Sequence, residues 1–87
     1  TPMPELSRFL GIVIYMYYRD HPPAHFHAVY GDFEVTVEIE SGTVHGKFPR
    51  RALNLVLEWK QLHRTELAAN WSRMLERRPL ERIAPLE

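Results

Sequence analysis

The side chains best suited to chemistry lie in one short stretch of the chain, residues 15–27. Three of the five histidines are there, beside a cation and a carboxylate, and together they form the set Arg19, Asp20, His21, His25 and His27. Histidine changes charge near neutral pH and is also a common metal ligand. The stretch therefore predicts a site for acid–base chemistry or for metal binding.

Two adjacent prolines, Pro22 and Pro23, stiffen this stretch. Each proline ring restricts φ, and a following proline pushes the preceding residue toward extended geometry. His25 and His27 come next and are two residues apart, so on a strand both imidazoles point to the same face. We expect a rigid corner that presents its histidines together.

The first hypothesis for this corner is acid–base catalysis by His21, His25 and His27, with Arg19 stabilising an anion. A metal-independent ribonuclease needs such a base, an acid and a cation near the scissile phosphate. No cofactor is required in this interpretation. His63, on one face of the predicted helix, is a candidate to join the corner.

The alternative hypothesis is a divalent transition metal held by His25, His27 and Glu38. Gly31-Asp32 is a two-residue turn signal, and pairing outward from it places Glu38 opposite His25. Imidazole nitrogens and a carboxylate oxygen suit Zn, Fe or Mn. A second turn at Ser41-Gly42 would place His45 opposite Glu38. A solvated sheet face with weak surface pairs, or histidines that only tie down the loop, would explain the same pattern.

Four strands and a helix are predicted from periodicity. Apolar and polar residues alternate strictly in 33–40, while the run 9–18 is apolar on both strand faces. Pro49 begins a helix that continues to about Arg77, with a kink or break near residues 63–65, where Thr65 could cap a second segment. The expected elements are strands at 9–18, 25–30, 33–40 and 43–48 and a helix at 50–77.

Strands followed by a helical block indicate an α+β fold in a single domain, 1–87. We expect a four-stranded antiparallel meander with one long or kinked C-terminal helix packed on one face, in contact with Phe26, Val35 and Val37. One helical layer covers only one face of the doubly apolar strand 9–18. The uncovered side predicts self-association or a protein partner.

Composition limits the function classes. The formal net charge is zero, so no overall field attracts nucleic acid. There is no cysteine, which excludes disulfides and thiolate chemistry in this sequence. The longest apolar run, residues 9–18, is too short to cross a bilayer. These features favour a cytoplasmic protein without a membrane segment.

The chain resembles a small bacterial family catalogued as domain of unknown function 4160. The resemblance runs from Met3 to about Leu86 and is carried by residues 3–9, 14–18 and 21–28, by 49–53 and 62–64 in the helical part, and by Asn70-Trp71. His21, Pro23, His25 and His27 match the family's histidine–proline run, whereas His45 lies outside its pattern.

The resemblance implies a compact cytoplasmic bacterial protein. Members are often encoded beside a small family numbered 2442, in a two-gene arrangement like a toxin–antitoxin pair. It therefore favours a toxin-like protein with a nearby-encoded partner, which could act on RNA through the corner. The competing hypothesis is a non-catalytic protein-interaction or metal-binding regulatory module.

Overall fold

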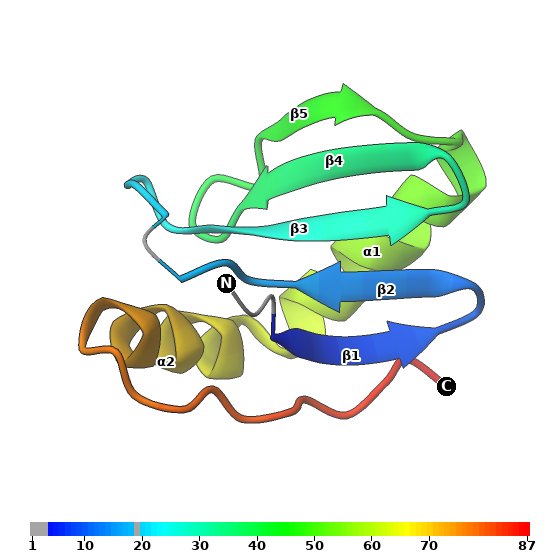
Figure 1. The fold of residues 1–87 in the computed structure, drawn as a ribbon. Coiled ribbons are helices and arrows are strands. Elements are labelled where there is room, and N and C mark those ends of the chain that lie inside the picture. Colours follow the sequence, from blue (N-terminus) through cyan, green and yellow to red (C-terminus); the bar gives the residue numbers. More distant parts are fainter. Residues whose placement is uncertain (1–3, 19) are drawn as a thin grey trace.

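The computed structural model describes residues 4–18 and 20–87. Within these residues the chain forms a five-stranded antiparallel sheet, in sequence order, followed by two helices (Figure 1). The elements are β1 (Glu5–Phe9), β2 (Ile12–Tyr15), β3 (His25–Tyr30), β4 (Phe33–Glu38), β5 (Val44–Lys47), α1 (Arg50–Leu62) and α2 (Arg64–Leu75). The α+β meander is confirmed, but the prediction of four strands and one helix is corrected to five strands and two helices.

The additional strand comes from the apolar run 9–18, which is not one strand. Leu10 and Gly11 turn the chain with φ of 51° and 83°, and Phe9 pairs with Ile12 across the turn. Positive φ at both turn residues matches the right-handed twist of a hairpin. The residues before this turn, Glu5–Phe9, therefore form an additional edge strand, β1. The sequence pattern gave no signal for this turn, because the residues on both sides of it are apolar and the periodicity does not change there.

The two rows of side chains in this region have different surroundings. Ile12, Ile14 and Met16 are fully buried in the core, whereas Tyr15 and Tyr17 are half-buried. The helices therefore cover one row, as expected. The other row is only partly covered by the described chain.

The β3–β4 register agrees with the prediction, with His25 opposite Glu38 and Phe26 opposite Val37. The predicted β4–β5 register is wrong by two residues, since His45 pairs with Thr36 rather than with Glu38. The connection is longer than a two-residue turn: the Glu38 N–H donates to the Thr43 carbonyl over 2.9 Å. A shift of two residues keeps every side chain on its expected face.

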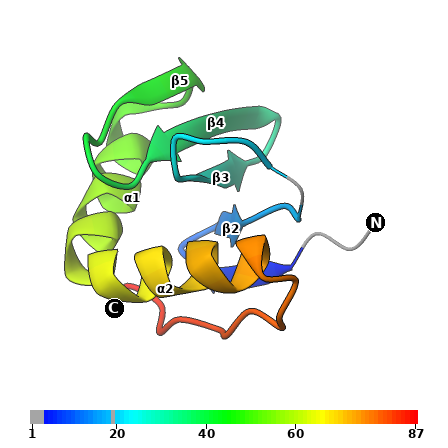
Figure 2. The ribbon, with the colours of Figure 1, turned by 90° about the vertical axis from the view of Figure 1, so that its left-hand side faces the viewer.

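The helical region is broken at His63, as predicted, where φ is −120° and ψ is 27°. Thr65, predicted as the cap of the second segment, lies inside α2 instead, because His63 is the residue that precedes the helix. Helix α1 covers the inner face of the sheet, and Trp59 packs 5.8 Å from Phe26 and 5.6 Å from Phe9 between ring centres. Figure 2 shows both helices and the strands from the side. Helix α2 lies near the end of the sheet where β3 begins, with Trp71 against His25.

The last residues, 76–87, form an extended segment that runs beside β1 (Figure 1). The Ile83 N–H donates to the Leu6 carbonyl over 2.8 Å. The buried side-chain amide of Asn70 donates to the carbonyl of Glu81 and accepts from its N–H, which mimics a strand pair. This segment is therefore docked on the fold by hydrogen bonds with the Leu6 carbonyl and the Trp59 indole. Neither helix has the length and apolar character required to cross a membrane.

Gly46 illustrates how closely β4 and β5 approach each other. Its φ is +114°, and a Cβ atom there would lie 2.7 Å from the Glu34 carbonyl oxygen. Gly46→Ala is therefore expected to destabilise the fold by about 3 kcal/mol in urea unfolding, from backbone strain and overpacking.

Gly31→Ala is the matched control, because Gly31 also has positive φ but no atom within 4 Å of the added Cβ. It should cost only about 1 kcal/mol from the left-handed conformation. Equal losses in the two variants would show that the close approach at Gly46 has no energetic effect.

Candidate functional site

A pocket of about 330 Å³ opens on the sheet face opposite the α1-covered core, where β3 begins. It brings together residues of the loop before β3 with residues of β3, β4 and β5. The lining is Asp20, His21, Pro23, His25, His27, Thr36, Glu38 and His45. The three histidines predicted from the sequence therefore gather at one pocket.

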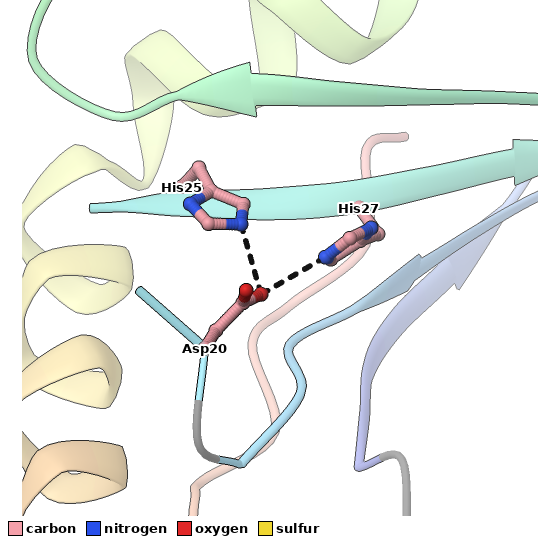
Figure 3. Close-up of side chains that lie close together, drawn as sticks. All are labelled: Asp20, His25 and His27. Carbon is pink, nitrogen blue, oxygen red and sulfur yellow. Dashed lines mark hydrogen bonds and ion pairs between the residues drawn. The ribbon is translucent and has the colours of Figure 1, made fainter. Parts of the chain in front are cut away.

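Asp20 is the centre of this pocket (Figure 3). Its Oδ2 lies 2.8 Å from Nε2 of His25 and 3.1 Å from Nε2 of His27. Among the described residues, these three side chains form a group whose ligand atoms all lie within 4.8 Å of one another. The carboxylate thus joins the two imidazoles that the strand pattern placed on one face.

The surrounding elements hold both imidazoles in place. His25 and His27 are each only 8% exposed, although they project from the polar face of β3. The ring centres of Tyr17 and His27 are 4.1 Å apart, and those of Trp71 in α2 and His25 are 5.3 Å apart. These contacts exclude water and leave little freedom to either ring.

Both nitrogens of His25 face hydrogen-bond acceptors. Nδ1 lies 2.8 Å from the carbonyl oxygen of Pro23, which can only accept, so Nδ1 carries a proton. A neutral imidazole has no second N–H, yet Nε2 faces the carboxylate of Asp20. His25 therefore requires either a second proton or a cation at Nε2.

His27 has a different environment. Its Nε2 lies at hydrogen-bond distance from Asp20, but its buried Nδ1 has no hydrogen-bond partner within residues 4–18 and 20–87. The nearest acceptor is a Glu34 carboxylate oxygen at 3.4 Å, without hydrogen-bond geometry. A small movement of the half-exposed Glu34 side chain would complete this contact.

The electrostatics of Asp20 favour its ionised form. Burial acts to raise the pKa of the carboxyl, but the hydrogen bond with His27, the charge of His25 and the His21 N–H outweigh it. The pKa of Asp20 is therefore below its ordinary value of 3.8. The pocket holds an ionised carboxylate in a largely buried position.

The remaining candidates take other places. Glu38 lines the pocket, but its carboxylate bonds to His45 over 3.0 Å and to Ser41 over 2.9 Å, and these bonds lower its pKa. From the sequence, Asp20 belongs to the corner but has no predicted catalytic or metal-binding role. Its position next to His21 is the only sequence feature that points to it as a site residue. His63 contacts Glu66 and Trp59 instead of the pocket. Arg19 lies outside the described residues.

The fold and the pocket define a small α+β protein with a carboxylate–histidine site. The chain belongs to the family described as Domain of unknown function (DUF4160), which matches residues 11–72. The matched range is narrower than the resemblance noted in the sequence, and it includes every residue that lines the pocket. No curated protein and no solved structure matches the chain.

Proposed function

We propose that the protein is a metal-binding module that holds a divalent transition metal through Asp20, His25 and His27. The observation that carries the proposal is His25, whose Nδ1–H donates to Pro23 while its Nε2 faces the Asp20 carboxylate. A metal ion between Nε2 and the carboxylate removes the need for a second proton. It also neutralises a carboxylate that is largely withdrawn from water.

The spacing of the ligand atoms supports the same conclusion. Asp20 Oδ2 lies 2.8 and 3.1 Å from the two Nε2 atoms. Two ligands that bind one ion at ~2.1 Å lie roughly 3.0 Å apart when they are at right angles and roughly 3.4 Å apart in a tetrahedral site. The three side chains thus need little rearrangement to coordinate an ion.

The partners of the outer nitrogens also suit metal ligands. A metal-binding imidazole commonly donates its other N–H to a carbonyl or carboxylate, which orients the ring. Pro23 provides such a carbonyl for His25, and Glu34 provides a nearby carboxylate for His27. Two nitrogens and one oxygen favour zinc, iron, cobalt or nickel over magnesium or calcium.

Metal binding is tested by titrating the chelator-treated protein with Zn²⁺ in competition with a colorimetric indicator. We expect one equivalent of Zn²⁺ to bind. His25→Ala or His27→Ala should weaken the Zn²⁺ affinity by at least ~10–100-fold, which is the loss caused by removing a hydrogen-bond partner of a metal ligand. His45→Ala is the matched control, because His45 lines the pocket but lies outside the converging group. Absence of binding, or an equal loss in His45→Ala, would contradict the proposal.

RNA cleavage without a metal is the second candidate function. It is favoured by the four histidines that line one pocket, His21, His25, His27 and His45. The lining, however, includes two carboxylates and, among the described residues, no lysine or arginine that could neutralise an RNA phosphate. Cleavage of RNA in the presence of a chelator, lost in His27→Ala, would favour this activity over the metal-binding module.

The biological setting is part of the same proposal. We place the protein in the cytoplasm as one member of a two-gene, toxin–antitoxin-like pair, with a small partner protein encoded nearby. Exposed apolar side chains at the turns, Leu10 and Phe33, support an interaction with that partner or with a second copy of the chain. A bound metal would then regulate the module rather than catalyse a reaction.

A further inference from the structure

His21 lies beside the converging group but is not part of it. Its side chain lines the same pocket and is exposed, in contrast to the buried His25 and His27. The centres of the His21 and His25 rings are 5.7 Å apart. His21 is therefore near the ligand atoms and has freedom to rotate.

The hydrogen bonds of His21 repeat the arrangement at His25. Nδ1 of His21 lies 3.1 Å from the carbonyl of Pro22, just as Nδ1 of His25 lies 2.8 Å from that of Pro23. Each carbonyl can only accept, so each Nδ1 carries the proton. Nε2 of His21 consequently offers a lone pair, with no hydrogen-bond partner among the described residues.

The ring separations fit a shared ion. His25 and His27 have ring centres 5.3 Å apart, and His21 and His25 have centres 5.7 Å apart. Two imidazoles that bind one tetrahedral zinc through Nε2 have centres roughly 5 Å apart. Rotation of one exposed side chain would bring His21 into the group.

We propose that His21 supplies the fourth ligand through Nε2, so that Asp20, His21, His25 and His27 hold zinc in a closed tetrahedral site. This inference rests on the proposed metal-binding function. Four protein ligands leave no open position for substrate, which is characteristic of structural rather than catalytic zinc. Zinc would then connect the loop before β3 to β3 itself and fix the conformation of that loop.

Cobalt(II) substitution tests the inference, because four-coordinate cobalt absorbs visible light much more strongly than six-coordinate cobalt. We expect intense bands for the wild type and shifted, weaker bands for His21→Ala, in which one or more water molecules replace the imidazole. The Zn²⁺ affinity of His21→Ala should fall by at least ~10–100-fold, because losing a ligand costs no less than losing a hydrogen-bond partner of a ligand. His45→Ala is again the control and should retain both the bands and the affinity.

A second variant, His21→Asn, separates ligation from loop tethering, because its amide can still donate to the Pro22 carbonyl. It should match His21→Ala in spectrum and affinity, while circular dichroism checks that all metal-free variants fold. Weak bands in the wild type, or wild-type bands and affinity in His21→Ala, would overturn the role of His21. The second result would leave the Asp20–His25–His27 site intact, whereas absence of metal binding by the wild type would refute both proposals.

Discussion

Trp59→Ala is expected to destabilise the protein by about 3–5 kcal/mol, the range for removing a fully buried aromatic side chain. Trp59 has no exposed surface and packs against Phe9 of β1 and Phe26 of β3. Its Nε1–H also donates to the Ala84 carbonyl over 2.9 Å, which attaches the C-terminal segment to α1. The substitution therefore removes contacts among three parts of the fold.

Urea unfolding followed by circular dichroism measures this loss. A domain of this length is stable by roughly 5–10 kcal/mol, so the variant should retain only roughly 0–7 kcal/mol and unfold at a markedly lower urea concentration than the wild type. Trp59→Phe is the control, because it keeps most of the aromatic area but lacks the donor to Ala84 and should lose less. A loss below about 1 kcal/mol in Trp59→Ala would show that this packing does not support the fold.

Asp20→Asn is expected to destabilise the metal-free protein by about 2 kcal/mol at pH 7, through the loss of a charge-assisted hydrogen bond to His27 and of the ion pair with His25. The asparagine keeps the shape of the side chain but carries no charge. The same change removes the only oxygen ligand proposed for the metal ion. Its cost should therefore increase further when Zn²⁺ is present.

The pH dependence of this effect has a definite sign. The pKa of Asp20 is lowered in the folded state, so the ionised carboxylate stabilises the fold at pH values above the unfolded pKa of 3.8. That stabilisation is lost as the pH falls below 3.8 and through the folded pKa. The difference between wild type and Asp20→Asn should accordingly shrink in acid.

Unfolding curves at several pH values between neutrality and about pH 3, with a chelator present, test this expectation. Glu40→Gln is a suitable control, because Glu40 is an exposed acidic residue that pairs with Arg64 and does not line the pocket. A constant difference between wild type and Asp20→Asn across this range would mean that ionisation of Asp20 does not contribute to folding.

Local sequence signals are sufficient to predict the strand pair β3–β4 and the common face of His25 and His27. Strict alternation in residues 33–38 and the Gly31-Asp32 turn define this register, because both signals are local. The break near His63 and the α+β order were likewise readable from helix formers, turn residues and periodicity. Local preference and tertiary packing agree at these positions.

Which residues come together at the pocket follows from tertiary contacts and cannot be predicted from the local sequence pattern. Asp20 precedes β3 in a loop without periodicity, so its approach to both Nε2 atoms depends on how the loop folds back. The Leu10-Gly11 turn and the β4–β5 register were also set by turn geometry that apolar pattern alone does not encode. Burial of His25 beside Trp71 required α2 to pack from a distant part of the chain. Contacts between residues far apart in sequence, which no local periodicity records, brought the predicted histidines together around Asp20.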